Sequence, residues 1–418
     1  MRIHFLTQPW ARALPPSESI AIWTREVGRR LADRHEVVVW ARRGRHERAK
    51  IQEDGVEYRF VVGNGDYRLE QLLTSRFDRL RSPQRPPFAS PLYNAAYHLA
   101  IARGLARAKP DVVHIQNFSQ VVPLVRRACP QALIVLHMHC EWLNQLDRRM
   151  IARRLAKADL VLGCSNHITD AARAAFPEYA DRFHTVYEGV DIDNFRQSSR
   201  TRTDDDPLQL LFVARVSPEK GVHVLVDAFT RLAAARPELR LAVIGGEGVM
   251  PREFGLDLDS NERVQALEPL WHAGYLEDCR ERIPSQFRDR VEFIPWMPQA
   301  GLAERMASAD IFIVPSVWEE PFGTPVIEAM ASRLPVIATR VGGIPELITH
   351  HVDGWLVPPG DPAALADAID TLANDPTTRT AIASAAPTRA QRFAFEQITD
   401  AVEQLYETRI ASQDTPSS

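Results

Sequence analysis

The sequence predicts an α/β protein made of two doubly wound domains. Three observations support this prediction. Short apolar runs alternate with stretches of helical periodicity along the chain, which is typical of parallel sheets whose strands are buried on both faces. At 418 residues the chain is longer than one ordinary hydrophobic core supports. A polar stretch without periodicity at 196–207 interrupts the alternation, which then starts again.

The first domain is expected to span residues 1–195. Its strands are short runs such as Val37-Val38-Val39, which have no polar face. They are expected at 2–7, 36–41, 56–62, 111–116, 132–138, 159–164 and 183–188. The helical stretches between them lie near 18–34, 91–108, 119–128, 147–157 and 166–175. A domain of this kind binds its ligands at the carboxyl ends of the strands.

Residues 196–207 are interpreted as a linker, and a second domain is expected at 208–390. Its strands are expected at 208–214, 239–244, 291–295, 311–315, 335–339 and 355–357. Its helices are expected at 219–235, 299–308, 325–332, 362–374 and 376–390. The segment 247–288 is long for a connection, so a partly ordered excursion with a later helical stretch is expected there. A last amphipathic helix is expected within 391–410, followed by a disordered tail at 411–418.

The composition indicates a soluble globular protein, with 45% hydrophobic and 25% charged residues. No apolar run reaches the length of about 18 residues that a membrane-spanning helix needs. The first residues lack the apolar core and cleavage site of a secretory signal, so a cytoplasmic protein is expected. The four cysteines have no metal-ligand spacing and are expected to be unbridged thiols. A nucleophilic pair of Cys140 and His139 is disfavoured, because adjacent side chains on a strand end point apart.

Charge is divided unevenly along the sequence. The first 200 residues carry 31 Lys and Arg against 21 Asp and Glu, a net charge of +10. The remainder carries 19 against 33, a net charge of −14. The basic half favours an anionic acceptor or peripheral association with the inner face of a membrane, while a solvated arginine-rich surface explains the charge equally well. Few aromatic residues lie among the arginine clusters, which argues against a nucleic-acid partner.

The most informative segment lies between residues 310 and 343. A buried strand that ends at Pro315 is followed by a turn and by a helix that begins near Pro325. Glu320 lies in the turn, and Glu328 lies about one turn into the helix. The first N–H groups of a helix lack intrahelical partners and form an anion site. Carboxylates can accept hydrogen bonds from sugar hydroxyls, and the amides beside them can bind a phosphate. This combination suits a nucleotide-sugar.

Two basic residues complete this pattern. Arg215 and Lys220 follow the first strand of the second domain, which places them at the carboxyl edge of its sheet. Arginine can bind a phosphate through two hydrogen bonds, and lysine adds a point charge. Both side chains suit the diphosphate of a nucleotide-sugar.

Glu320 and Glu328 are separated by seven residues, with a Pro-Phe-Gly insert directly after the first glutamate. This spacing resembles the E-x7-E motif of the retaining glycosyltransferases of family 4, and Arg215 and Lys220 match the R-x4-K motif of that family. The resemblance covers nearly the whole chain and is strongest at 208–375. It implies the GT-B fold, in which two Rossmann-like domains face a central cleft and the last helix crosses back to the first domain.

The resemblance also implies a role for individual side chains. Arg215 and Lys220 bind the donor diphosphate and neutralise it as the sugar leaves. Glu328 accepts hydrogen bonds from the ribose hydroxyls, and Glu320 accepts a hydrogen bond from a hydroxyl of the transferred sugar. His139, at the end of a strand in the first domain, matches the histidine that contacts the donor sugar and phosphate. The expected catalytic residues are therefore His139, Arg215, Lys220 and Glu320.

Backbone groups are implied as further donor ligands. The amides of Phe322, Gly323 and Thr324 line the sugar and phosphate in this interpretation. Gly246 belongs to a glycine-rich turn at the edge of the cleft. Ile294 lies in the region through which relatives bind the base.

The chain departs from the family pattern at two places. The loop at 8–20 lacks the glycine pair with which many relatives approach the donor phosphate. Glu188 replaces the asparagine of a common Asn-Gly-Val-Asp sequence. The roles of this loop and of Glu188 stay open at this point.

The resemblance implies a hexosyltransferase that uses a nucleoside-diphosphate sugar and retains the configuration of the anomeric carbon. A UDP-sugar is favoured, and the acceptor is a hydroxyl of a glycan, a lipid or a small molecule, with polysaccharide biosynthesis as the expected context. No metal ion and no cofactor are expected, because fixed cations neutralise the diphosphate. The mechanism favoured is attack on the face that the phosphate leaves, since Glu141 is the only nearby carboxylate that a double displacement could use.

Several alternatives stay open. One is a mannosyltransferase that uses GDP-mannose, and another is a catalytically inactive scaffold that binds a nucleotide-sugar. The intact residues Arg215, Lys220, Glu320 and Glu328 argue against the inactive scaffold. An epimerase or a phosphorylase on the same two-domain scaffold is a further rival. A Rossmann dehydrogenase is disfavoured, because no G-x-G-x-x-G sequence opens the first helix.

Overall fold

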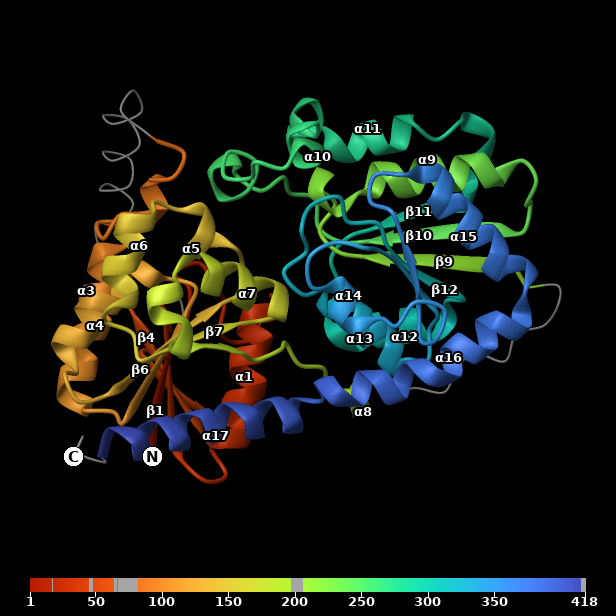
Figure 1. The fold of residues 1–418 in the computed structure, drawn as a ribbon. Helices are drawn as coiled ribbons and strands as arrows, with labels where there is room; N and C mark the ends of the chain where they lie inside the picture. Colours follow the sequence, from red (N-terminus) through yellow and green to blue (C-terminus); the bar gives the residue numbers. More distant parts are fainter. Residues whose placement is uncertain (17, 45–47, 64–65, 67–81, 197–205, 415–418) are drawn as a thin grey trace. The chain divides into compact units, whose positions relative to one another are not determined.

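The computed structural model describes residues 1–16, 18–44, 48–63, 66, 82–196 and 206–414. Their contacts divide the chain into two compact units. The first unit contains Met1–Glu188 and Phe395–Ser418, and the second contains Gly189–Ala394. Each unit contains a sheet of mainly parallel strands with helices packed on it (Figure 1). The prediction of two doubly wound α/β domains is therefore confirmed.

The described strands of the first unit form one sheet in the order β3-β4-β2-β1-β5-β6-β7-β8. The strands are β1 (Arg2–Leu6), β2 (Glu36–Arg42), β3 (Lys50–Glu53), β4 (Val56–Val61), β5 (Val112–Gln116), β6 (Leu133–Met138), β7 (Leu160–Gly163) and β8 (Phe183–Thr185). All neighbours are parallel except β3 and β4, which form an antiparallel pair. The sequence did not predict β3, because this edge strand has no buried residue and so no apolar run.

Helices cover both faces of this sheet. They are α1 (Ser19–Leu31), α3 (Ala95–Ala108), α4 (Val122–Ala128), α5 (Trp142–Gln145), α6 (Arg148–Leu155), α7 (Asn166–Ala175) and α17 (Phe395–Asp414). Trp23 and Val27 of α1 and Val402 of α17 share one hydrophobic core with Phe5 and Val135 of the sheet. Because side chains alternate between the faces of a strand, every second residue of β5, β6 and β7 points toward α1 and α17.

The last helix, α17, belongs to the first unit although it ends the chain. It lies beside α1 (Figure 1) and contributes Phe395, Ile398, Val402 and Tyr406 to the core of that unit. The crossing occurs between Ala394 and Phe395, within the predicted range 391–410. The helix continues to Asp414, so the prediction of a disordered tail is wrong for 411–414. Residues 415–418 lie outside the described residues.

The boundary between the units differs from the predicted one. The contacts divide the chain after Glu188, whereas the predicted linker began at 196. The residues in between belong to the second unit, because Val190 donates its N–H to the carbonyl of Phe393 at 2.9 Å and Phe195 is buried. Most of the predicted linker, 197–205, lies outside the described residues.

The described strands of the second unit form a fully parallel sheet in the order β11-β10-β9-β12-β13-β14. They are β9 (Leu208–Val213), β10 (Leu239–Ile244), β11 (Val291–Ile294), β12 (Ile311–Val314), β13 (Val336–Thr339) and β14 (Trp355–Val357). The main helices are α8 (Ile192–Phe195), α9 (Val222–Ala233), α12 (Gln299–Ser308), α13 (Thr324–Ala331), α14 (Ile344–Leu347), α15 (Pro362–Asn374) and α16 (Pro376–Ala390). The chain leaves β9 toward β10 and returns on its other side at β12, so the strand order reverses between β9 and β12.

The excursion at 247–288 is more ordered than predicted. It contains α10 (Glu262–Gln265) and α11 (Tyr275–Glu281) together with short 3₁₀ turns. Val264, Trp271 and Tyr275 are buried in the core of the second unit. These apolar anchors hold the excursion on the unit, although its helices are too short to show a clear periodicity in the sequence.

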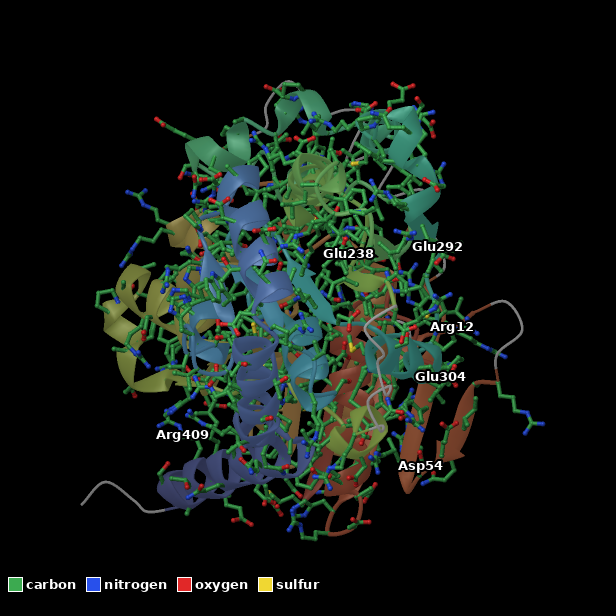
Figure 2. All side chains as sticks on the ribbon, turned by 90° about the vertical axis from the view of Figure 1, so that its right-hand side faces the viewer. Arg12, Asp54, Glu238, Glu292, Glu304 and Arg409 are labelled. Carbon is green, nitrogen blue, oxygen red and sulfur yellow. The ribbon has the colours of Figure 1, made fainter. Side chains whose placement is uncertain are left out.

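Charged side chains lie on the outside of both units (Figure 2). Arg12 and Asp54 are exposed on the first unit, and Glu292 and Glu304 are exposed on the second. Within the described ranges, every helix is too short or too polar to cross a lipid bilayer.

Candidate active site

The predicted donor residues of the second unit gather where its strand order reverses. Arg215 follows β9, and Lys220 ends a 3₁₀ turn at Pro218–Lys220. Glu320 follows β12, the neighbour of β9 on the other side. Parallel α/β sheets bind ligands in the crevice outside this reversal, because the connections to the two strands diverge there.

Lys220 and Glu320 form an ion pair across this point. The Nζ atom of Lys220 lies 2.8 Å from each carboxylate oxygen of Glu320. Trp318 Nε1 and Ser316 Oγ each donate to Oε2 of Glu320 at 3.0 Å. The ammonium group also lies over the Trp318 ring, 4.9 Å from its centre. The carboxylate of Glu320 therefore accepts four hydrogen bonds in a nearly buried position.

These partners decide the charge of Glu320. Burial alone would raise the pKa of this carboxyl, but the charge of Lys220 and the hydrogen bonds from Lys220, Trp318 and Ser316 outweigh burial. The pKa of Glu320 is lowered below its ordinary value of 4.5. Glu320 is therefore a carboxylate at neutral pH.

The loop that carries Glu320 is fixed by a glycine turn and by the excursion. Gly342 has φ = +52°, and a Cβ atom there would lie 2.1 Å from the carbonyl oxygen of Glu320. Gly343 donates its N–H to that same carbonyl at 2.8 Å. Glu319 accepts the N–H of Gly342 at 2.6 Å and an N–H of Arg263, on α10, also at 2.6 Å. The glycine turn at 342–343 thus packs directly against the backbone of Glu320.

Arg215 is held by a residue to which sequence reasoning assigned no role. Its Nη2 atom donates to Oε1 of Glu219 at 2.6 Å, and Ser217 Oγ donates to the same oxygen at 2.6 Å. Glu219 is fully buried, whereas 40% of the Arg215 side chain is exposed. The buried carboxylate of Glu219 thus holds one side of the guanidinium, and exposed N–H groups of Arg215 can still bind a ligand. In the sequence, the position of the acidic Glu219 between Arg215 and Lys220 was the sign that could have predicted this contact.

Glu328 is in a different state from Glu320. It is buried on α13, and Gln299 Nε2 donates to its Oε1 at 3.3 Å. Burial raises the pKa of Glu328 from 4.5 to about 8, because a neutral amide offsets little of the cost of burying a charge. Glu328 is therefore mostly protonated at neutral pH, and the two glutamates of the motif carry different charges.

The residues that follow Glu320 start α13. Gly323 has φ = +103° and occupies the position before the first helical residue, Thr324. The Phe322 side chain is buried and packs edge-to-face on Phe393, with ring centres 5.7 Å apart. Pro325 lies in the first turn and has no N–H to offer. This arrangement leaves the backbone of the turn, rather than the Phe322 ring, as the part that can contact a ligand.

Gly246 and Ile294 lie at the carboxyl ends of the strands next to β9. The carbonyl of Gly246 accepts the N–H of Val216 at 3.0 Å, and the carbonyl of Ile294 accepts that of Gly245 at 3.0 Å. Trp296, two residues beyond Ile294, is 56% exposed. Its Cβ atom lies 3.9 Å from the position of a Cβ on Gly246.

His139 of the first unit follows β6 on the face covered by α1 and α17. Its Nδ1 atom lies 2.5 Å from Oε1 of Glu188, and its Nε2 atom lies 2.8 Å from Oε1 of Gln116. The His139 side chain is only 3% exposed. Glu188, whose role stayed open in the sequence, is therefore the direct partner of the predicted catalytic histidine.

The hydrogen-bond network fixes where protons lie around His139. Thr24 Oγ1 donates to the carbonyl of Ile20 at 2.7 Å, so it accepts the bond from Gln116 Nε2 at 3.1 Å. The Oε1 atom of Gln116 then faces His139 Nε2, which must carry a proton. A second proton lies between His139 Nδ1 and Glu188. The ring thus uses both nitrogens inside the first unit.

Neighbouring histidines are buried and neutral. His137, two residues before His139, is fully buried, and burial lowers its pKa well below 6.5. Burial also lowers the pKa of His114 to about 3. The Nδ1 atom of His114 lies 2.5 Å from the hydroxyl of Tyr406 on α17. His137 and His114 therefore serve the packing of this face, and His139 is the member of the group nearest the carboxyl ends of the strands.

Two rival chemistries find little support near His139. Burial raises the pKa of the Cys140 thiol to about 12, so the nucleophilic pair of Cys140 and His139 is not favoured. Glu141 lies 3.0 Å from Nε2 of His167. In the glycine-free loop at 8–20, Trp10 is 45% exposed and its ring packs against Phe118.

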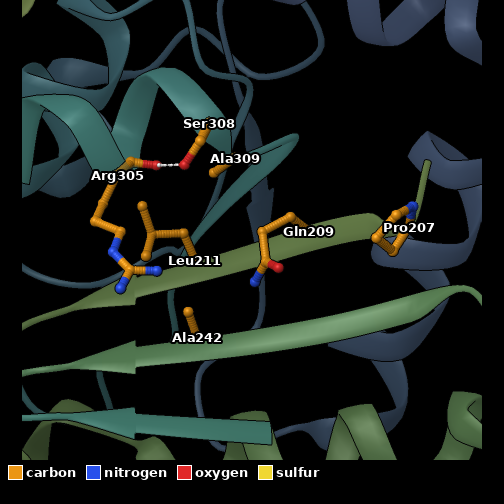
Figure 3. Close-up of a pocket in the computed structure, with 7 residues that line it drawn as sticks. All are labelled: Pro207, Gln209, Leu211, Ala242, Arg305, Ser308 and Ala309. Carbon is orange, nitrogen blue, oxygen red and sulfur yellow. Dashed lines mark hydrogen bonds between the residues drawn. The ribbon is translucent and has the colours of Figure 1, made fainter. Parts of the chain in front are cut away.

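A small pocket of about 100 Å³ lies elsewhere on the second unit, between α12 and the strands β9 and β10 (Figure 3). The residues that line it are Pro207, Gln209, Leu211, Ala242, Arg305, Ser308 and Ala309. Ser308 Oγ donates to the backbone carbonyl of Arg305 at 2.9 Å. The lining contains none of the predicted site residues, so this pocket is not part of the candidate active site.

Two family models match the chain in succession. The model of glycosyltransferase family 4 matches residues 20–194. The model of glycosyl transferases group 1 matches residues 193–389. The first match contains His139 and Glu188, and the second contains the residues that gather at β9 and β12.

Individual proteins are similar over large parts of the chain. YtcC of Bacillus subtilis is 28% identical over 294 residues, which are 67% of this chain and 68% of YtcC. The D-inositol 3-phosphate glycosyltransferase of Saccharomonospora viridis is 30% identical over 266 residues, 62% of this chain and 57% of that protein. The crystal structure of Anabaena Alr3699/HepE with UDP and glucose covers 98% of this chain and 100% of its own, with a TM-score of 0.68 and 20% identity. At 20% identity, the similarity to the Anabaena structure shows a shared fold.

Proposed function

The chain belongs to glycosyltransferase family 4, and we propose that it moves a sugar from a nucleoside-diphosphate donor to an acceptor hydroxyl with retention at the anomeric carbon. The observation that carries this proposal is the Lys220–Glu320 ion pair at the reversal of the strand order. A cation for a diphosphate and an acceptor for a sugar hydroxyl lie there within one hydrogen bond of each other.

Donor binding redistributes the contacts of this ion pair. The diphosphate takes hydrogen bonds from Lys220, and a sugar hydroxyl donates to Glu320 in return. Arg215, with 40% of its side chain exposed, adds a second cation. Fixed cations stabilise the negative charge that develops on the leaving diphosphate, and Glu219 already holds Arg215 in place. The transfer therefore needs no metal ion.

Glu328 accepts the ribose hydroxyls in this proposal. Hydrogen bonds from hydroxyl groups favour the charged form of a carboxyl and lower its pKa. Because the pKa of Glu328 is about 8 without such partners, donor binding at neutral pH releases a proton from it. The amides of Phe322, Gly323 and Thr324 contact the sugar and phosphate.

Retention follows from attack on the face that the phosphate leaves, with the phosphate accepting the proton of the acceptor hydroxyl. A double displacement would need a nucleophilic carboxylate. Glu141, the candidate for that role, is paired with His167. For His139 to contact the donor sugar and phosphate, as proposed, one ring nitrogen exchanges its present partner, Gln116 or Glu188, for the donor.

The donor favoured is a UDP-sugar. The solved structure with UDP and glucose supports this choice through its fold, and the exposed Trp296 beside Gly246 offers an aromatic surface for a base. A GDP-mannose donor and an inactive scaffold are the alternatives. The acceptor is a hydroxyl of a glycan, a lipid or a small molecule. The net charge of +10 on the first 200 residues favours an anionic acceptor or a place at the inner face of a membrane.

A panel of UDP-, GDP- and ADP-sugars tests the proposal. Purified protein is incubated with each sugar, and release of the nucleoside diphosphate is measured without an acceptor. One class of donor is expected to be hydrolysed slowly, and Lys220→Ala is expected to abolish this. Lys157→Ala, an exposed lysine of the first unit, is the matched control and should leave the rate unchanged. If the protein neither hydrolyses nor binds any nucleotide-sugar, the proposed function is wrong.

A further inference from the structure

Three neighbouring strands of the first unit end in three side chains that can bind a metal. The strands β6, β7 and β8 are adjacent and parallel. His139 directly follows β6, Cys164 directly follows β7, and Glu188 follows β8. One ligand atom from each residue lies within 4.8 Å of the other two. All three residues are buried, with exposed fractions of 8%, 1% and 5%.

We propose that His139, Cys164 and Glu188 bind one divalent transition-metal ion of the zinc class. An imidazole nitrogen, a thiolate and a carboxylate oxygen are ligands of zinc. The soft thiolate selects zinc and cobalt over magnesium and calcium, which prefer oxygen ligands alone. This site is separate from the diphosphate residues of the second unit, which need no metal.

The surroundings of His139 orient it as a ligand. Metal-binding histidines usually donate the other ring N–H to a fixed acceptor, which holds the ring in place. Here Nε2 donates to Gln116 Oε1 at 2.8 Å, and Thr24 holds Gln116 in turn. The Nδ1 atom therefore points at Glu188, with which it shares a proton. A metal ion replaces that proton and the thiol proton of Cys164, and both protons go to solvent.

The fit requires only a small rearrangement. Zinc bonds of about 2.1 Å at a tetrahedral angle place ligand nitrogen and oxygen about 3.4 Å apart. The Nδ1–Oε1 distance of 2.5 Å must therefore increase by about 1 Å. The three ligand atoms already lie within 4.8 Å of one another, so Cys164 has to approach the other two only slightly. Side-chain rotation supplies both changes, and the fourth position takes a water molecule.

The consequence for the reaction rests on the proposed function. A metal on Nδ1 occupies the histidine that the transfer uses, so zinc is expected to inhibit donor hydrolysis. Metal binding itself does not depend on that function, because it needs only the three side chains of the first unit.

Cobalt titration of the metal-free protein tests the site. A thiolate bound to Co²⁺ gives a charge-transfer band in the near ultraviolet, and a tetrahedral site gives strong visible bands. We expect both at one equivalent of Co²⁺, and we expect Zn²⁺ to abolish them by displacement. Cys164→Ser should lose the charge-transfer band. Glu188→Gln should keep the band and weaken Co²⁺ binding at least about tenfold.

Controls separate this site from other thiols and from misfolding. Cys279→Ser, in the second unit, should keep the wild-type spectrum. Thermal unfolding of the Cys164→Ser protein without metal checks that it is folded, and Zn²⁺ should raise the unfolding temperature of the wild type but not of this variant. A wild-type protein without the charge-transfer band, or a band that persists in Cys164→Ser, would overturn the inference.

The outcomes distinguish the metal site from the proposed function. A cobalt band in a protein that hydrolyses no nucleotide-sugar supports the site and rejects the function. Hydrolysis without a cobalt band supports the function and rejects the site. Zinc inhibition that survives in Cys164→Ser would show that inhibition arises elsewhere and would reject the link between the two.

Discussion

Glu320 accepts hydrogen bonds from Lys220, Trp318 and Ser316, whereas Glu328 meets the neutral amide of Gln299. Both glutamates are buried, so these partners alone separate their pKa values. The pKa of Glu320 is lowered below 4.5, and burial raises that of Glu328 to about 8. One motif therefore holds a carboxylate and, eight positions later, a carboxyl that is mostly protonated at neutral pH.

The raised pKa of Glu328 makes the stability of the protein depend on pH. Below pH 4.5 this carboxyl is protonated in both the folded and the unfolded chain and changes nothing. Between pH 4.5 and about 8 only the folded chain keeps the proton, so its free energy of unfolding falls as pH rises. Glu328→Gln lacks this penalty. At pH 8.5 it should unfold at a higher temperature than the wild type, by about 2–4 °C for each 1 kcal/mol.

Thermal unfolding at pH 5 and pH 8.5 measures this difference. The advantage of Glu328→Gln should shrink at pH 5, where most of the penalty is absent from both proteins. Glu304→Gln, at an exposed position on the same unit, controls for the loss of one negative charge. An equal effect of Glu328→Gln at both pH values would contradict a raised pKa at this position.

The sequence allowed some of these residues to be predicted and not others. Arg215, Lys220 and Glu320 were predicted because a local motif places them at strand ends, and the structure brings them to the reversal of one sheet. The pairing of His139 with Glu188 joins residues that are distant along the chain. No spacing rule reveals such a contact, and the substitution of Glu188 for asparagine was its only sign.

The turns at the strand ends position these side chains more than the strands do. Gly342 has a positive φ and touches the backbone of Glu320, so only a residue without a side chain fits there. Gly221 has φ = +73°, and a Cβ atom on it would lie 2.0 Å from the carbonyl oxygen of Pro315. Both glycines let the connections after β9, β12 and β13 approach one another.

Gly342→Ala should displace Glu320 and reduce donor hydrolysis at least tenfold. The added Cβ would meet the carbonyl oxygen of Glu320 at 2.1 Å, so the loop must move. Gly360→Ala is the matched control, because Gly360 also has a positive φ of +71° but nothing lies within 4 Å of its Cβ position. That control should cost about 1 kcal/mol of stability from backbone strain and keep its activity. Equal losses of activity in both variants would show that strain, and not the contact with Glu320, is responsible.

Several elements match their predicted ranges, whereas helices of four residues and a polar edge strand were missed. The helices α12, α15 and α16 match their predicted ranges, and so does β14. The helices α5, α10 and α14 have four residues each, which is too short for a hydrophobic period to appear. The strand β3 was missed because its residues are exposed or half-exposed, and the segment is a strand only through its pairing with β4.

The first unit is completed by a helix from the far end of the sequence. Four apolar residues of α17 enter its core, and the Tyr406 hydroxyl lies 2.5 Å from Nδ1 of His114. The return of the last helix to the first domain was predicted from the family resemblance, because a helical pattern alone does not say which domain a helix joins. The boundary at Glu188 was not, because Val190 is tied to the second unit by a backbone bond to Phe393.

Tyr406→Phe tests how firmly α17 is tied to this core. The change removes one hydroxyl and leaves Nδ1 of the buried His114 without its partner, which should cost about 1–3 kcal/mol of unfolding free energy. Denaturant unfolding monitored by circular dichroism measures the loss. Tyr179→Phe removes a hydroxyl that is only partly buried and should change stability by less than about 0.5 kcal/mol. A Tyr406→Phe protein as stable as the wild type would mean that α17 is held by its apolar contacts alone.

Calorimetric titration of the best donor into variants of the β9–β12 site tests the proposed function most directly. Lys220→Ala removes a charged donor of hydrogen bonds to the diphosphate, which should weaken binding by about 1.5–3 kcal/mol, or roughly 10- to 100-fold in Kd. Arg215→Ala should have a similar effect, and Lys157→Ala should have none. Wild-type affinity in both site variants would contradict the placement of the diphosphate at this reversal of the sheet.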